Sequence, residues 1–318
     1  MQSNRPTSVL SAQLQDTALR YLLEVVRSGS VSDAAQRLNV TPSAVSRQIG
    51  ALEALLGVSL FERRPRGMVP SPEGEVLAAH ARRVAMEAER VVSDIQALQG
   101  LHRGMVRICS SSGFAIEFLP RVIAQFRRSH PGMQFQLRVC GPQAATQALL
   151  RGDADIALTY SRSVERDISV AYRSPSSIYA FMRKDHPLSA HQHLSLQQLQ
   201  PHAIALPDPE NTVRQLFDIA CSQKGLIFEP VLVCNQFDAL VHFVLHGGGV
   251  SIAGDITVRD RVLCGELHAA PIRERGMVGR NVEVQTLADR TLPEGPRAFT
   301  QFLIEQLEQQ AKEPLRSD

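Results

Sequence analysis

Residues 32–66 read SDAAQRLNVTPSAVSRQIGALEALLGVSLFERRPR, and this stretch decides how the amino-terminal part of the chain folds. It predicts one helix over Asp33–Leu38, a break at Asn39–Thr41 and a second helix that begins at Pro42. Thr41 is a good N-cap, because its hydroxyl can accept a hydrogen bond from a free backbone N–H of the first turn. Proline suits the next position, since its missing N–H costs nothing there and its φ is already helical. Two short helices joined by a tight turn are typical of units that place a helix end in a DNA groove.

The second predicted helix has an apolar stripe and a polar end. Its apolar residues recur at spacings of four, three and four, which predicts a buried face made of Val45, Ile49, Leu52 and Leu56. The polar side chains at its amino-terminal end suit base recognition, because arginine pairs with guanine and glutamine with adenine. An ordinary solvated helix face is the alternative. We expect DNA contacts from Thr41, Pro42, Ser43, Ser46, Arg47 and Gln48.

An arginine cluster follows the two helices. Arg63, Arg64 and Arg66 surround Pro65 and precede Gly67, as expected of the turn of a wing. Arginine there would follow the phosphates or enter a narrow A/T-rich minor groove. An isolated basic triplet is more often a solvated loop. These arginines, however, follow closely after a capped helix-turn-helix, and that combination favours DNA binding. We therefore count the three arginines among the candidate DNA-binding residues.

A long motif identifies the family that this region resembles. The run A-A-x-x-L-x-V-T-x-S-A-V-S-R-Q-I-x-x-L-E-x-x-L-G-V-x-L-F-E-R begins at Ala34, and with it the stretch from about Leu14 to Ser71 resembles the winged helix-turn-helix of LysR-type transcriptional regulators. The resemblance implies base or backbone contacts by the helix residues and backbone contacts by the wing arginines. It also implies a DNA-binding transcription factor and not an enzyme. The implied partners are double-stranded promoter DNA, a small-molecule effector, further copies of this chain in a homodimer or homotetramer, and RNA polymerase.

Composition limits the class of protein further. The chain has 318 residues and a formal net charge of only +2, so its basic character is local. The sequence MQSNRPTSVLSAQLQD at the amino terminus lacks the apolar core of a signal peptide, and no apolar run approaches membrane length. We expect a cytoplasmic protein without a membrane partner that associates with the nucleoid when bound to DNA. The five cysteines are scattered without C-x-x-C spacing, which argues against a disulfide framework or a zinc site.

A second helical periodicity follows the wing. Ser71 and Pro72 repeat the capping pattern of Thr41 and Pro42 and predict a helix that runs to about Gln99. Its apolar residues alternate at spacings of four and three, which is the pattern of a coiled-coil seam. We expect this seam to join two copies of the chain, although it could instead pack on the chain's own domain. The predicted dimerisation residues are Leu77, Ala81, Val84, Ala88, Val91, Ile95 and Leu98.

From Met105 onwards, short apolar strands alternate with helices, which predicts a mainly parallel α/β sheet. Two such rounds resemble the two-lobed effector domain of LysR-type regulators, which has a periplasmic-binding-protein-like (type 2) α/β fold. The segments that carry this resemblance are LLRGDADIA at 149–157 and HGGGVSI at 246–252.

The predicted organisation has four parts. It places an extension at 1–13, a winged helix-turn-helix at 14–71 with the helix-turn-helix itself at 31–50, a linker and dimerisation helix at 72–100, and an effector domain at 104–310. Lobe I of that domain is expected at about 104–173 and 271–305, and lobe II at about 174–270.

Ligands of open α/β sheets bind at the carboxyl ends of strands, which locates the candidate effector site. The first such end is Ser110-Ser111-Ser112-Gly113, directly before a helix, where hydroxyls and free N–H groups could hold an anion. A capping turn without a ligand is an equally good interpretation. We expect a small organic acid, with Ser110–Ser112 holding its anionic group. The candidate effector-binding residues are Ser110, Ser111, Ser112, Gly113, Pro142, Gln143, Thr159, Asn235 and Phe237.

Other chemistries receive little support from the sequence. His186, His191 and His193 lie close together, but no carboxylate or cysteine completes a metal-ligand set. Cys221 and Cys234 lie in the lobe where peroxide-sensing relatives carry a reactive pair, but their spacing differs from that pair. We see no nucleophile–base motif, phosphate loop or dinucleotide fingerprint, and we expect no catalytic residues, metal or cofactor. A solute-binding transport protein and a redox switch on the same scaffold remain alternatives to a metabolite-controlled regulator.

Overall fold

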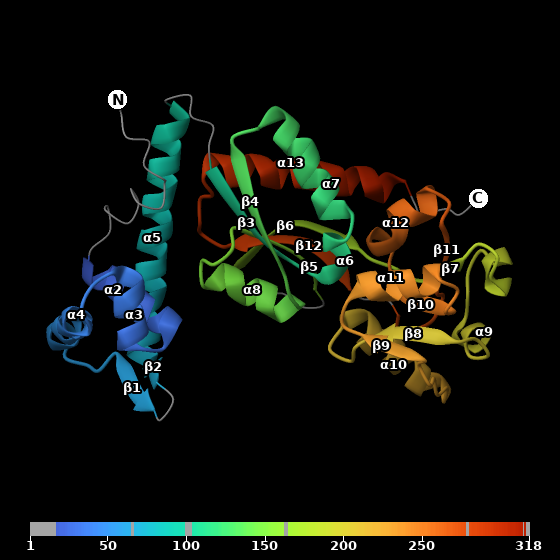
Figure 1. Ribbon diagram of the computed structural model, residues 1–318, viewed down its shortest axis with the longest axis horizontal. Coiled ribbons are helices and arrows are strands. Elements are labelled where there is room, and N and C mark those ends of the chain that lie inside the picture. The colour runs from blue at the N-terminus through green and yellow to red at the C-terminus, as the bar shows by residue number, and fades with distance from the viewer. Residues whose placement is uncertain are drawn as a thin grey trace. The chain divides into compact units, whose positions relative to one another are not determined.

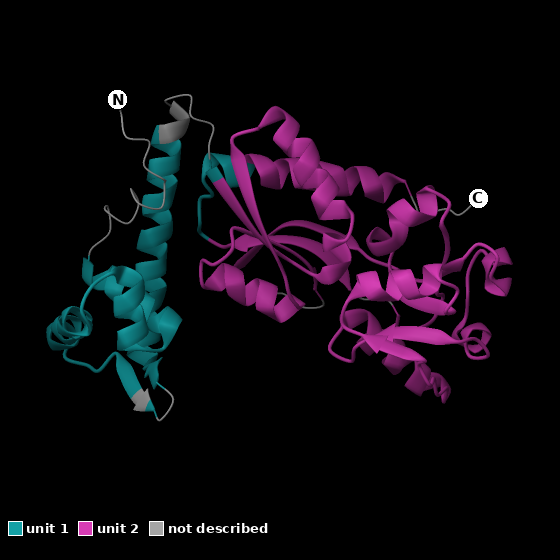
Figure 2. Cartoon of the chain, viewed as in Figure 1, with its two compact units in different colours: residues 1–104, 289–297 teal, residues 105–288, 298–318 magenta. Residues whose placement is uncertain are grey.

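The computed structural model describes residues 17–64, 67–98, 104–161, 165–277, 280–313 and 315, with side chains for all of these except 63 and 96–98. The predicted extension at 1–13 and Arg66 therefore lie outside the described residues, as do the side chains of Arg63 and Leu98. The chain divides into two compact units (Figure 2). One comprises residues 1–104 and 289–297, and the other comprises residues 105–288 and 298–318.

The first unit contains the helix-turn-helix and a two-stranded wing (Figure 1). Its elements are α2 (Thr17–Ser28), α3 (Val31–Leu38), α4 (Pro42–Leu56), β1 (Phe61–Arg64) and the antiparallel β2 (Gly67–Pro70). Thr41 caps α4 as predicted, because its Oγ1 accepts a hydrogen bond of 3.3 Å from the amide of Ala44. Asn39 ends α3 with a left-handed backbone, φ 54°, which turns the chain sharply into the next helix.

The apolar stripe of α4 reaches the core of this unit only along its first turns. Val45 and Ile49 are buried, and Leu52 packs partly against the same cluster. Leu56 is 48% exposed, so the prediction that it is buried was wrong. The helix ends at this residue and Gly57 follows in the left-handed region, so the last turn projects beyond the core.

The long helix α5 (Pro72–Leu98) begins inside the same core. Ser71 caps it as expected, because its Oγ accepts a hydrogen bond of 3.0 Å from the amide of Gly74. Ala78 and Ala81 are buried among the helix-turn-helix residues. The start of the predicted dimer seam therefore packs on its own domain, which is the alternative that the heptad pattern left open. Further along, Ile95 is 50% exposed.

The second unit contains two α/β lobes. The described strands of lobe I form a five-stranded sheet in the order β4-β3-β5-β12-β6. They are β3 (Gly104–Ser110), β4 (Met133–Val139), β5 (Ile156–Ser161), β6 (Ile168–Pro175) and β12 (Asn281–Leu287). β3 is parallel to β5, whereas β12 is antiparallel to both β5 and β6. The helices are α6 (Ser112–Ala115), α7 (Phe118–Ser129), α8 (Pro142–Leu150) and α13 (Glu294–Lys312); α7 and α13 cover one face of the sheet and α8 covers the other (Figure 1).

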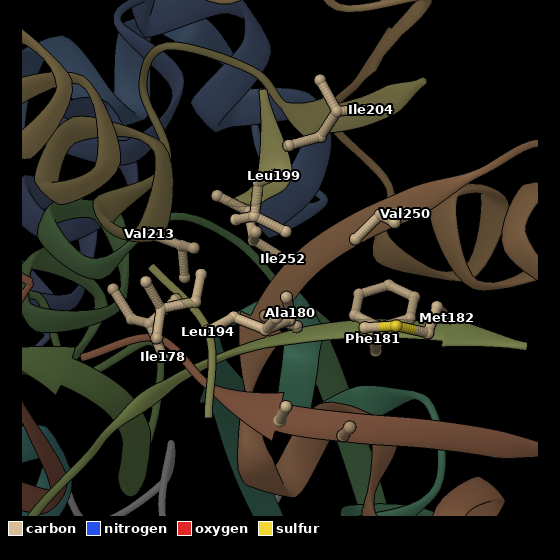
Figure 3. Packing of buried hydrophobic residues seen from close by; sticks show 14 of the residues in the cluster. Ile178, Ala180, Phe181, Met182, Leu194, Leu199, Ile204, Val213, Val250 and Ile252 are labelled. Atoms are coloured by element: carbon tan, nitrogen blue, oxygen red, sulfur yellow. The ribbon is translucent and has the colours of Figure 1, made fainter. Parts of the chain in front are cut away.

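Lobe II repeats this architecture. Its described strands follow the order β11-β7-β10-β8-β9. They are β7 (Ile178–Arg183), β8 (Ile204–Pro207), β9 (Leu232–Cys234), β10 (Val250–Gly254) and β11 (Leu267–Pro271). The helices are η1 (Pro187–Ala190), α9 (Leu196–Leu199), α10 (Thr212–Lys224), α11 (Phe237–Leu245) and α12 (Asp255–Leu263). Figure 3 shows the apolar core, in which Ala180 of β7 lies opposite Ile252 of β10.

The chain crosses between the lobes twice among the described strands. Ser176 and Ser177 connect β6 to β7, and residues 272–280 lead from β11 back to β12. The two crossings are joined, because the amide of Ser176 donates a hydrogen bond of 3.2 Å to the carbonyl of Arg280. This architecture confirms the predicted two-lobed α/β fold class, but both sheets are mixed, so the prediction of a mainly parallel sheet was wrong. The antiparallel pairs come from the crossing strands and their neighbours, and β6, β11 and α12 were not predicted. None of the helices among the described residues is both long and apolar enough to span a membrane.

One stability prediction concerns the junction between α5 and the helix-turn-helix core. A Cβ atom on Gly74 would lie 2.0 Å from the backbone oxygen of Leu60, so Gly74→Ala must displace the start of the helix. We expect a loss of about 1–3 kcal/mol in the unfolding free energy of the first unit, measured by urea titration. Gly50→Ala is the matched control, because a Cβ there meets open space and alanine favours the helix. Equal stability of the two variants would contradict this account.

Candidate functional site

The amino-terminal end of α4 presents the predicted DNA-contacting residues on one face. Ser43, Ser46 and Arg47 are exposed, whereas Gln48 lies one turn beyond the buried Val45 and is half-buried. Arg47 makes no ion pair with another described residue, so its guanidinium is available to an external acceptor. The charge of Arg47, at the centre of this face, is therefore not neutralised by another described residue.

Thr41 and Pro42 differ from the other residues of this face. Both are exposed, but the Thr41 hydroxyl already accepts the capping bond and lies 3.0 Å from the Ser43 hydroxyl. Pro42 carries no N–H donor. In the structure, Thr41 and Pro42 fix where α4 begins. The start of the helix in turn fixes the positions of the polar side chains that follow.

The wing carries a cation that is partly neutralised. Arg64 lies at the end of β1, and its Nη2 is 3.1 Å from Oε2 of Glu62; both side chains are more than half exposed. An exposed pair of this kind contributes little to stability, typically below 1 kcal/mol. Arg64 can therefore exchange this partner for a phosphate at small cost.

A cavity of about 260 Å³ lies between the two lobes of the second unit. Both lobes contribute to it through the loops that follow the carboxyl ends of their strands. It collects most of the predicted effector-binding residues, namely Ser111, Ser112, Gly113, Pro142, Asn235 and Phe237.

Three predicted effector residues do not line this cavity. Ser110 is fully buried, and its hydroxyl donates to the carbonyl of Ser111. Thr159 is also buried, with its hydroxyl 3.0 Å from that of Ser111. Gln143 is exposed on α8 outside the cavity lining. Side chains alternate between the faces of a strand, so Tyr160, the neighbour of Thr159, lines the cavity instead.

Several helices point their amino-terminal ends at this cavity. The N-cap residues of α8, α10, α11 and α12 all line it: Gly141, Asn211, Gln236 and Gly254. Only Asn211 caps its helix with a side-chain hydrogen bond, whereas the other three helices lack one. Free N–H groups at helix starts carry partial positive charge. The cavity wall therefore favours negative charge.

Arg280 adds a full positive charge to the same wall. The residue is 1% exposed and lines the cavity. Its Nη2 donates a hydrogen bond of 3.2 Å to the Ser176 hydroxyl, whereas Nε and Nη1 have no hydrogen-bond partner among the described residues. The guanidinium lies 3.9 Å from the centroid of the Tyr160 ring. Burial lowers the pKa of Arg280 from its ordinary value, but arginine remains protonated in proteins.

Sequence reasoning missed Arg280 for a topological reason. The residue precedes the strand Asn281–Leu287 and looks like a solvated charge at a strand start. Only the antiparallel pairing of β12 with β5, in which Val282 lies opposite Tyr160, brings it to the carboxyl end of β5. No local pattern contains that information.

Two ion pairs join the lobes beside the cavity. Glu117, the residue before α7, accepts from Nε of Arg261 on α12 at 2.6 Å. Arg121 of α7 lies 3.2 Å from the carboxylate of Asp260 on α12. Burial raises the pKa of Glu117, and the Arg261 charge opposes that shift. In one pair the acidic residue lies at the start of α7 and the basic residue on α12, and in the other pair the order is reversed. A shift of one helix along the other would bring like charges together, so the pairs fix the register of the two helices.

The described cysteines are free thiols, and burial disfavours the thiolate form of two of them. Burial raises the pKa of the Cys221 thiol to about 11, and burial together with Cys109 raises that of Cys140 to about 11. Thiolate is the reactive form, so both groups are poor redox nucleophiles at neutral pH. His186 accepts a hydrogen bond from the amide of Leu188 and caps the start of η1. No three His, Cys, Asp or Glu side chains in the described part of the chain are arranged to hold a metal ion.

Comparison with known proteins identifies the family of both units. Residues 17–75 match the family model described as bacterial regulatory helix-turn-helix protein, lysR family, and residues 99–308 match the LysR substrate binding domain. The transcriptional dual regulator GltC of Bacillus subtilis is 30% identical over 90% of this chain and 95% of its own length. The RuBisCO operon transcriptional regulator of Allochromatium vinosum is 27% identical over 76% of this chain and 83% of its own length.

Solved structures share the fold. A mutant form of full-length OxyR from Pseudomonas aeruginosa superposes with a TM-score of 0.68 at 20% identity, covering 96% of this chain and 95% of that one. The two family models together span the helix-turn-helix and both lobes, and the relatives are transcriptional regulators and not enzymes or transport proteins. The chain belongs to the LysR family of bacterial DNA-binding transcriptional regulators.

Proposed function

We propose that this regulator binds promoter DNA through the polar end of α4 and the wing, and that an anionic small molecule in the interlobe cavity controls this binding. The observation that carries the second part is the buried guanidinium of Arg280. A buried charge whose hydrogen-bonding groups are only partly satisfied is unfavourable, and an anion in the cavity would satisfy the remainder. The uncapped starts of three helices favour the same charge.

The position of Arg280 supports a route from ligand to lobe geometry. The residue lies on one crossing between the lobes, and both its carbonyl and its Nη2 are bonded to Ser176 on the other crossing. A ligand that recruits the guanidinium acts directly on the segments about which the lobes turn. The effector would be allosteric if ligand affinity and DNA affinity prove to be reciprocally coupled.

Assembly is the second part of the proposal. We infer that two copies pair along the part of α5 that extends beyond the helix-turn-helix core. Val84, Ala88, Val91 and Ile95 would form the seam, and two such dimers would form a tetramer. Paired helix-turn-helix units would read a twofold-related DNA site. The regulator would act in the cytoplasm on the nucleoid and contact RNA polymerase there, and these two statements rest on the family alone.

Substitutions on the DNA-contacting face should separate base reading from phosphate contact. Arg47→Ala should relax base preference at one position by about 1–3 kcal/mol, whereas Arg64→Ala should weaken binding to all sequences and reduce the salt dependence by about one phosphate contact. Fluorescence anisotropy on a selected operator and on single-base variants measures both. Arg128→Ala, at an exposed site near the end of α7, is the control. Wild-type behaviour of both test variants would sink the assignment.

Pairing along α5 is tested by a charge in the seam. Ile95→Glu should weaken self-association at least tenfold, because burying an isoleucine is worth about 1.5–3 kcal/mol. Sedimentation velocity over a range of concentrations gives the dissociation constants. His80→Glu places the same charge on an exposed position of α5 outside the seam and should leave the association unchanged. If both variants associate like the wild type, the seam lies elsewhere.

Replacement of Arg280 should separate ligand binding from stability. Arg280→Met removes a buried, incompletely bonded charge together with its hydrogen bond to Ser176, and these effects oppose each other, so the stability of the ligand-free protein should change by no more than about 1 kcal/mol. A small carboxylate or phosphate that binds the wild type should stabilise it by about 2.7 kcal/mol when its concentration is one hundred times Kd. In the variant this stabilisation should disappear. Thermal unfolding with each anion measures both effects. A ligand-free variant that is several kcal/mol less stable than the wild type would show that Arg280 is structural.

A further inference from the structure

The charges that line the interlobe cavity are unevenly distributed. Among the lining residues, Arg280 is the only basic one, and Asp208 and Glu210 are the only acidic ones. Arg280 is buried, whereas Asp208 is half-buried and Glu210 is exposed. The positive charge is therefore enclosed, and the two negative charges lie on the solvent side of the same cavity.

The two carboxylates are not used by the fold. They lie in the loop between β8 and α10, and no ion pair joins either of them to another described residue. The first cation along the helix, Arg214, instead pairs with Asp218 at 2.8 Å and donates to the carbonyl of Pro207 at 3.3 Å. The start of α10 is already capped by the side chain of Asn211. Neither helix capping nor charge pairing accounts for Asp208 and Glu210.

We propose that the effector is dipolar: an amino-acid-like zwitterion whose carboxylate meets Arg280 and whose ammonium group meets Asp208 and Glu210. This inference rests on the proposed function and narrows it. A dianion would meet one cation and two like charges, and a neutral apolar compound would leave Nε and Nη1 of Arg280 without a hydrogen-bond partner. A zwitterion satisfies both ends of the cavity through charge-assisted hydrogen bonds.

The size and lining of the cavity fit this class. A protein cavity of about 150 Å³ accommodates benzene, so a cavity of about 260 Å³ suits a compound of roughly ten non-hydrogen atoms. Between the charged ends, the wall offers hydroxyls and amides together with apolar groups such as Val139 and Phe237. That mixture accommodates a short side chain of either polarity, so the charged ends carry the selectivity.

The test compares three probe sets on the full-length protein by titration calorimetry. They are the standard α-amino acids, the corresponding α-hydroxy acids, which lack the ammonium group, and the amino-acid methyl esters, which lack the carboxylate. At least one amino acid should bind, and its hydroxy acid and its ester should each bind at least about tenfold more weakly.

Variants assign the two ends. In D208N/E210Q, binding of the amino acid should weaken about tenfold, while its hydroxy acid binds as in the wild type or more tightly. Glu229→Gln removes an exposed carboxylate of the same lobe outside the cavity and should change neither affinity. In Arg280→Met, both compounds should lose binding.

The outcomes separate the inference from the function on which it rests. A hydroxy acid that binds the wild type as tightly as its amino acid overturns the dipolar ligand and leaves an anionic effector. Esters that bind as tightly as the free acids overturn the anionic effector as well. Failure of every amino acid to bind at millimolar concentration overturns the proposal, whether or not other anions bind.

Discussion

The two strand-to-strand crossings between the lobes are the constraint on which the effector domain depends. They are joined by a backbone hydrogen bond and by the side chain of Arg280, both to Ser176. The same guanidinium forms part of the cavity wall and lies over Tyr160. An anion in the cavity, as proposed, would therefore act on one of the two segments that connect the lobes, and so on the motion of the lobes relative to each other. The ion pairs between α7 and α12 limit that motion from the side.

Most of the DNA-binding unit could be predicted because its signals are local. The cap at Thr41, the proline after it and the polar end of α4 depend on neighbouring residues, and the structure contains them as expected. The exception is Leu56, where the apolar spacing continued but the helix had reached the end of the core. Periodicity alone does not indicate how far a core extends. The same limit applies to α5, where one continuous heptad pattern serves its own domain at Ala81 and leaves Ile95 half exposed.

The interlobe cavity could be predicted only in part, because it is assembled from distant segments. Strand ends and glycine turns indicated Ser111, Gly113 and Asn235, which line the cavity. Arg280 came from a strand whose partner is more than one hundred residues away, and no local pattern reveals that pairing. Ser110 and Thr159 were predicted together with residues that do line the cavity but are themselves buried outside its lining, because strand ends do not indicate which of two alternating faces borders the cavity. Both errors concern tertiary pairing and not secondary structure.

The burial of the first turns of α5 has a mechanical consequence. Gly74 lies against the backbone of Leu60, and Ala78 and Ala81 are buried in the helix-turn-helix core. The start of α5 and the helix-turn-helix therefore form one rigid body. A helix of 27 residues acts as a lever of about 40 Å. A tilt of the helix by about 5° about its far end displaces the helix-turn-helix by roughly 3.4 Å, which is one base-pair step. If α4 contacts bases as proposed, small rotations at the far end of α5 are sufficient to shift those contacts by one base pair.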